Sequence, residues 1–172
     1  MSERYPKAPD VRFEQAFKDL QARLVQEAEQ YIGFPTIRYR TPEQGMSPSE
    51  GFDCSGFITF LLDSLALPRE ATIRHADEYF ARFGDFVHEG RQRAGDLVFF
   101  SANGIFPTHV GLMKDTQQYI HAPGKDGEHV RIDSVVRAEI PIQQAYSDKQ
   151  IYIVNPIGYK RLVDPRFRLP VR

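Results

Sequence analysis

The chain reads Gly51-Phe52-Asp53-Cys54-Ser55-Gly56-Phe57 where a turn-rich loop gives way to an apolar helical pattern. Cys54 is the only cysteine in the 172 residues, and it stands at the expected first turn of a helix. The unpaired backbone N–H groups at a helix start carry partial positive charge, which favours thiolate over thiol. The stretch therefore predicts a nucleophilic cysteine at a helix N-terminus.

Three helices are expected around this stretch. Apolar residues recur at three- and four-residue steps over residues 13–32 and again over 55–67, and a weaker pattern covers 72–83. Residues 36–51 hold prolines and glycines without any period, so they predict an ordered loop that leads to Cys54.

The second half of the chain has the pattern of strands. Helices followed by strands predict an α+β domain in which an antiparallel sheet packs on the Cys54 helix. The basic tail from Lys160 to Arg172 is expected to wrap the surface. The expected strands are residues 96–100, 109–114, 118–121, 130–133 and 151–154.

Composition limits the class of protein. The chain is 41% hydrophobic and 26% charged with a formal net charge of −1, which indicates a globular domain and gives no electrostatic argument for nucleic acid or an anionic membrane as partner. No apolar run suggests membrane insertion or a signal peptide, so the chain as written is expected to be cytoplasmic, or exported or in the cell envelope if a leader has been removed. The oligomeric state stays open.

Two histidines in strand-like segments complete the candidate chemistry. Imidazole takes and returns protons near neutral pH, so His109 is the candidate base for Cys54, and His121 is expected to orient it across a hairpin. Gly111 is expected to leave room for the helix start. The backbone N–H of Cys54 is the expected oxyanion donor.

Other interpretations of these residues remain open at this stage. Cys54, His109 and His121 are chemically able to bind zinc, although no fourth ligand stands out, and His121 is alternatively a hydrogen-bonded sheet histidine. Arg69 either reaches the cleft or is solvated. The remaining histidines have charged neighbours and are most simply surface residues: His75, His88 and His129.

Four blocks in order, Phe52–Phe57, Gly95–Phe100, His109–Gly111 and Ile120–Ala122, resemble the signature blocks of NlpC-type cysteine peptidases. These are papain-like enzymes that cleave bacterial cell-wall peptides, many of them between γ-D-glutamate and diaminopimelate. The resemblance covers roughly residues 31–154. It implies a papain-like fold, a Cys54–His109–His121 triad acting through a thioester without metal or cofactor, and peptidoglycan fragments or stem peptides as partners.

The resemblance also implies residues that bind the substrate. Asp53 and Ser55 match positions that hold a free amino terminus in such enzymes, and Tyr39 matches a tyrosine that lines the site. Asp53 is equally suited to cap the helix. The loop from Thr41 to Gly51 departs from the family pattern, because it is lengthened and lacks the usual glycine pair.

The whole chain, residues 1–172, is expected to be a single catalytic domain with short terminal extensions and no SH3-like accessory domain. Two alternatives to a peptidase are kept. One is a papain-like amidase or acyltransferase that acts on a lipid or another small substrate. The other is a binding domain that retains the pocket without turnover.

Overall fold

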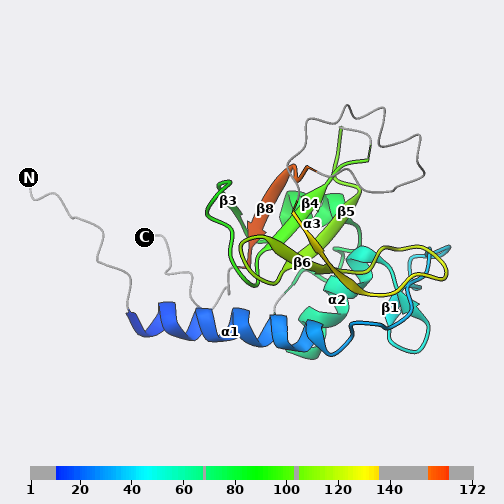
Figure 1. The fold of residues 1–172 in the computed structure, drawn as a ribbon, viewed down its shortest axis with the longest axis horizontal. Helices are drawn as coiled ribbons and strands as arrows, with labels where there is room; N and C mark the ends of the chain where they lie inside the picture. The colour runs from blue at the N-terminus through cyan, green and yellow to red at the C-terminus, as the bar shows by residue number, and fades with distance from the viewer. Residues whose placement is uncertain (1–10, 68, 103–104, 136–154, 163–172) are drawn as a thin grey trace, which may run out of the picture.

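A computed structural model describes residues 11–67, 69–102, 105–135 and 155–162 of the chain. The described residues form three helices, a two-stranded ribbon and a larger sheet (Figure 1). In chain order the elements are α1 (Val11–Glu29), β1 (Met46–Ser47), β2 (Gly51–Phe52), α2 (Cys54–Ser64), α3 (Ala76–Arg82), β3 (Asp85–Val87), β4 (Leu97–Phe100), β5 (His109–Met113), β6 (Gln118–His121), β7 (Arg131–Ser134) and β8 (Gly158–Arg161).

The larger sheet is antiparallel and has the strand order β3-β8-β4-β5-β6-β7. The strand pairs β4–β5, β5–β6 and β6–β7 each join neighbours in the chain, whereas β8 returns from the far end of the sequence to lie between β3 and β4. His109 on β5 is opposite Phe100 on β4, and His121 on β6 is opposite Arg131 on β7. The two histidines thus lie on adjacent strands.

Helix α2 packs its apolar side against one face of the sheet, with α1 on its other side (Figure 1). Phe57, Ile58, Leu61 and Leu62 are almost completely buried there, which explains why residues with helical spacing after Cys54 form a helix at this place. A smaller cluster covers the opposite face of the sheet, and its buried members are Val98, Phe100, Met113, Tyr119 and Tyr159.

A buried carboxylate ties α1 to the sheet. Asp96, which precedes β4, accepts hydrogen bonds from Gln21 Nε2 on α1 at 3.1 Å and from Arg161 Nη2 on β8 at 2.7 Å. Because a buried charge needs such partners, this cluster stabilises the position of α1 against the sheet.

The expected helices and four of the expected strands are present, which confirms the α+β prediction. The third helix is shorter than predicted, since it begins at Ala76 rather than at residue 72. The expectation of a surface tail from Lys160 is wrong for Lys160 and Arg161, which lie in β8, and Lys160 is buried. The strand expected at 151–154 and the tail beyond residue 162 fall outside the described residues.

Candidate active site

Cys54 is the first residue of α2, as predicted, and Asp53 is its N-cap. The Asp53 side chain accepts a hydrogen bond from the backbone N–H of Gly56 at 2.8 Å, which satisfies one of the donors that a helix start leaves without an intrahelical acceptor. Cys54 lines a cavity of about 310 Å³. Tyr39, Ser55, His75 and Thr108 also line this cavity.

The thiol of Cys54 lies beside the start of β5. The backbone N–H of Val110 hydrogen-bonds the sulfur and lowers its pKa, and Thr108 lines the same cavity. Since these two residues flank His109 in the chain, the structure brings the predicted nucleophile and the predicted base to one place.

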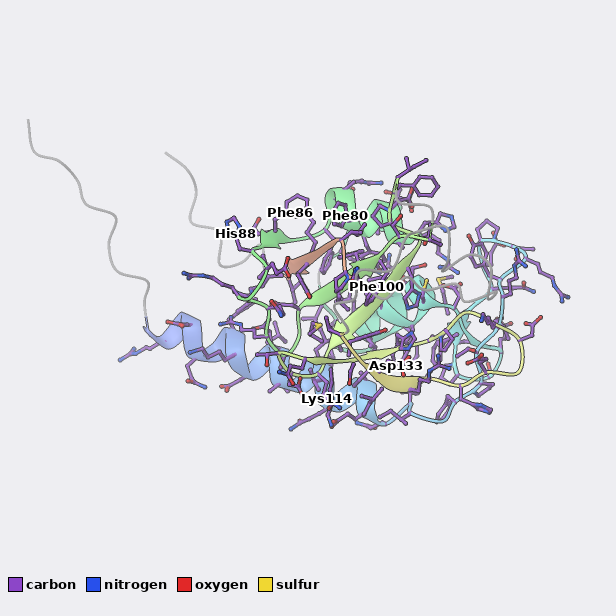
Figure 2. The ribbon with its side chains drawn as sticks, turned by 45° about the horizontal axis from the view of Figure 1, so that its top comes forward. Phe80, Phe86, His88, Phe100, Lys114 and Asp133 are labelled. Carbon is purple, nitrogen blue, oxygen red and sulfur yellow. The ribbon has the colours of Figure 1, made fainter. Side chains whose placement is uncertain are left out.

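A chain of hydrogen bonds runs from His109 across the next two strands. His109 Nε2 lies 2.9 Å from His121 Nδ1, and His121 Nε2 lies 2.8 Å from Asp133 Oδ2 on β7. Arg131 Nε donates to the same Asp133 oxygen at 3.1 Å. Both histidines are buried, whereas the side chain of Asp133, which is labelled in Figure 2, is 37% exposed on the edge strand β7. The sequence analysis did not identify Asp133.

Gly111 makes room for the hydrogen-bonded histidines, whereas the sequence predicted that it makes room for the start of α2. A Cβ at Gly111 would lie 2.7 Å from the Tyr119 ring and 3.3 Å from His121 Cβ. The space left by the missing side chain is therefore taken by residues of β6 and not by the start of α2. This finding corrects the reason given for Gly111, and it explains how His121 comes close to His109.

The electrostatics of the pair differ from the expectation at the sequence level. Burial raises the pKa of Cys54 to about 12, and the negative charge of Asp53 acts in the same direction. Burial also lowers the pKa of His109 well below 6.5, and the charges of His121 and Arg131 add to this. In both groups burial favours the neutral form, thiol for Cys54 and imidazole for His109, and it opposes the field of the helix start.

Asp133, the last residue in this series of hydrogen bonds, is negatively charged. Burial by itself raises the pKa of Asp133, but the hydrogen bonds from His121 and Arg131 bring it below its usual value of 3.8. Burial lowers the pKa of His121, and its hydrogen bond with Asp133 opposes that shift. Asp133 thus supplies a fixed carboxylate beside a neutral imidazole.

The Asp53 carboxylate is not directed at open solvent. It is paired with Arg74, whose Nη1 donates to Asp53 Oδ1 at 3.1 Å and whose Nη2 donates to Asp53 Oδ2. Arg74 Nη1 also donates to Ser55 Oγ at 3.0 Å, and Ser55 Oγ donates to Asp53 Oδ1 at 3.2 Å. Both residues expected to bind the substrate amine therefore have partners within the protein.

Tyr39 and His75 form one wall of the cavity. The Tyr39 hydroxyl lies 3.4 Å from His75 Nδ1, and the Tyr39 ring lies against the Arg74 guanidinium, 5.2 Å from its central carbon. His75, which was expected at the surface, is half-buried, precedes α3 and lines the cavity. Arg69 pairs with Asp63 near the end of α2, whereas Arg74 pairs with Asp53, the residue before Cys54.

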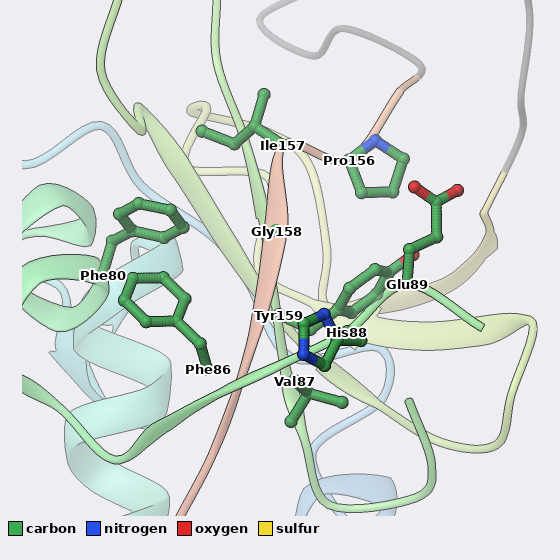
Figure 3. Close-up of a pocket in the computed structure, with 9 residues that line it drawn as sticks. All are labelled: Phe80, Phe86, Val87, His88, Glu89, Pro156, Ile157, Gly158 and Tyr159. Atoms are coloured by element: carbon green, nitrogen blue, oxygen red, sulfur yellow. The ribbon is translucent and has the colours of Figure 1, made fainter. Parts of the chain in front are cut away.

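A second cavity, of about 290 Å³, is lined by residues of α3, of the paired strands β3 and β8 and of the segments beside them, at the other edge of the sheet (Figure 3). Its lining is mainly apolar and aromatic, with His88 and Glu89 at one side, and it includes neither Cys54 nor the two buried histidines.

Among the described residues, no cluster of His, Cys, Asp and Glu is arranged to hold a metal ion. None of the described helices has the length and apolarity needed to cross a bilayer.

The sequence pattern of the NlpC/P60 family matches residues 39–149. The chain belongs to this family. Its match to Protein P54 of Enterococcus faecium is 34% identical over 123 residues, which is 66% of this chain and 20% of that protein. The gamma-DL-glutamyl hydrolase of Bacillus subtilis (strain 168) is 35% identical over 105 residues, 58% of this chain and 22% of that protein. The aligned part is thus about a fifth of each relative's length.

Solved structures of NlpC/P60 proteins have the same fold. The NlpC/p60 domain of the peptidoglycan hydrolase SagA matches 83% of this chain and 98% of its own at a TM-score of 0.58 and 29% identity. An NlpC/P60 family protein from Bacillus cereus ATCC 10987 matches 83% of this chain and 40% of its own at a TM-score of 0.63 and 24% identity. The predicted papain-like fold is confirmed.

Proposed function

We propose that this chain is a cysteine endopeptidase that hydrolyses the γ-D-glutamyl-diaminopimelate bond of peptidoglycan stem peptides through a thioester. The observation that carries the proposal is the buried hydrogen-bonded chain from His109 to Asp133, which begins beside Cys54 in an open cavity. A named gamma-DL-glutamyl hydrolase and a named peptidoglycan hydrolase among the similar proteins support the choice of substrate.

The hydrogen bonds assign a proton to each ring nitrogen. Asp133 only accepts, so His121 carries its proton on Nε2 and donates it to the carboxylate. His121 Nδ1 is then an acceptor, so His109 donates to it from Nε2. His109 Nδ1 therefore holds a lone pair, and we propose that this nitrogen removes the proton from the Cys54 thiol.

In the acylation step, the Cys54 proton moves to His109 as the sulfur attacks the carbonyl carbon. The backbone N–H of Cys54, which has no intrahelical acceptor, faces the developing oxyanion. The C–N bond then breaks, and His109 returns the proton to the leaving amine. Water, deprotonated by His109, attacks the thioester and releases the γ-D-glutamyl acid and the free thiol.

Because burial favours the neutral thiol and the neutral imidazole, the proposed base catalysis is concerted. His109 becomes positive only while the sulfur attacks, and at that moment the negative charge of Asp133 acts on it through His121. Asp133 is in this sense a positioning residue that orients the imidazoles and favours their protonation in the transition state. Tyr39 and Ser55 line the cavity and remain proposed substrate-binding residues.

The test is mass spectrometry of products from defined muropeptides with the wild type and with Cys54→Ala and His109→Ala. We expect cleavage after the γ-D-glutamyl residue and a loss on the order of 10³-fold or more in either variant, since the two groups act as a unit. Transfer of the acyl group to an added amine in place of hydrolysis would favour the acyltransferase alternative. An absence of turnover on every peptide would favour a binding domain.

The described residues around α2 and the sheet share one main hydrophobic core. We propose that they form one catalytic domain acting on peptidoglycan or its fragments.

A further inference from the structure

The Asp53 carboxylate has partners on both of its oxygens. Oδ1 accepts from the Gly56 backbone, from Ser55 and from Arg74, and Oδ2 accepts from Arg74. The Asp53 side chain is only 3% exposed and that of Arg74 only 12%. A substrate ammonium would have to displace a buried guanidinium to reach this carboxylate.

The loop before β1 closes the other approach to Asp53. Gly45 has φ +79, and a Cβ at this position would lie 2.2 Å from Asp53 Oδ2. Arg74 holds the same loop, because its Nε donates to the Pro42 carbonyl at 2.8 Å and its Nη2 to the Gln44 carbonyl at 2.6 Å. The lengthened loop and Arg74 together enclose the acidic group next to the nucleophile.

The charges at this position already cancel. Arg74 supplies one positive charge to the single negative charge of Asp53, so the pair attracts an incoming ammonium only weakly. Of the residues that line the cavity, Asp77 alone is acidic, and it is exposed to water that screens it. Phe106, Pro107 and Thr108 on the opposite side are uncharged.

We infer that Arg74 fills the place beside Asp53 that a substrate ammonium would take, so this enzyme accepts stem peptides whose L-alanine nitrogen is acylated as readily as those with a free amine. Stems still joined to muramic acid have that chemistry, whereas released peptides carry a free amine. The inference rests on the proposed function for its substrate. It replaces the amine-binding role that the sequence predicted for Asp53 and Ser55.

The experiment compares kcat/KM for L-alanyl-γ-D-glutamyl-diaminopimelate and for its N-acetylated form. In the wild type we expect the two values to agree within about threefold. In Arg74→Gln the unpaired Asp53 carboxylate should favour the free amine by about tenfold or more, since charge-assisted pairs in buried sites are strong. Adding Asp53→Asn to Arg74→Gln should remove that preference.

Arg69→Gln is the matched control, because Arg69 also pairs with an aspartate, but its partner is Asp63 and not Asp53. It should keep the wild-type ratio. A wild-type preference for the free amine above threefold overturns the inference, and so does an unchanged ratio in Arg74→Gln. The wild-type comparison needs no variant, so it decides the matter even if Arg74→Gln fails to fold.

A second measurement separates this inference from the proposed function. If the wild type cleaves neither peptide, the proposed function and the substrate class fail together. The pairing of Arg74 with Asp53 is then tested by the rate of Cys54 alkylation at fixed pH. Loss of the positive charge in Arg74→Gln should slow alkylation, and loss of the negative charge in Asp53→Asn should accelerate it. Equal rates in all three proteins would overturn the pairing.

Discussion

Replacement of Asp133 tests the hydrogen bonds that join His109, His121 and Asp133. Asp133 is the member of this series that was not predicted from the sequence. Asp133→Ala removes the acceptor of His121 Nε2–H, so His121 no longer has a fixed tautomer and His109 loses its orientation. Asp133→Asn keeps an acceptor oxygen but removes the charge. The two variants therefore separate orientation from electrostatics.

The magnitude follows from the kind of bond that is lost. A hydrogen bond to a charged group contributes roughly 1.5–3 kcal/mol. Because the Asp133 side chain is 37% exposed, water weakens its effect, and we use the lower half of that range. At about 1.4 kcal/mol for each tenfold change, Asp133→Ala should reduce kcat/KM by roughly 10- to 40-fold. Asp133→Asn should reduce it less.

The assay is kcat/KM against pH for wild type, both Asp133 variants and the control Asp19→Asn, which removes an exposed carboxylate on α1. Asp133 raises the pKa of His121, so its loss should weaken the base and move the acidic limb of the profile to lower pH. A purely structural role would leave that limb in place. Asp133→Ala activity within twofold of wild type, with an unshifted limb, would refute the proposed chain.

Three further predictions concern the same region. Iodoacetamide alkylation of Cys54 should have its inflection above the value of about 8.5 for a free cysteine, because burial raises the thiol pKa; an inflection near neutral pH would indicate an ion pair instead. In the folded protein the pKa values of His109 and His121 lie below 6.5, so the unfolded chain binds more protons than the folded one. The free energy of unfolding should therefore fall as the pH drops below about 6.5. The expected slope is about 1.4 kcal/mol per pH unit for each histidine, until the pH reaches the folded pKa of that histidine. Denaturant unfolding measures this slope, which should shrink in His121→Gln and would be absent if the histidines were solvated. Gly45→Ala should destabilise the protein by about 1–3 kcal/mol through its positive φ and its clash with Asp53, and an unchanged melting temperature would contradict that packing.

The positions of Cys54 and the two histidines were predictable because each stands in a short pattern that sets its backbone. Cys54 follows a capping residue and precedes apolar residues at helical spacing, and each histidine lies in a short strand. Asp133 was not identified, since the register between β6 and β7 depends on the intervening turn, which sequence alone does not fix.

Arg74 and β8 were missed for other reasons. Arg74 lies within the weak helical pattern of residues 72–83, and nothing in the sequence indicates that its guanidinium turns toward Asp53. The residues of β8 include Lys160 and Arg161, whose charges suggested a surface tail. Their long side chains instead reach polar partners, Gly84 O for Lys160 and Asp96 for Arg161, so tertiary contacts outweigh local pattern. Burial, which raises the pKa of the Cys54 thiol, cannot be read from a motif.

The position of β8 has a consequence for how the protein forms. Every element that carries a proposed catalytic group is synthesised by Ser134, but the sheet is continuous only after Gly158–Arg161 pairs with both β3 and β4. A nascent chain that has just completed β7 therefore exposes the backbone edge of β4, a site at which other chains can pair. Stop codons between β7 and β8 should accordingly yield aggregated chains in place of shortened enzymes.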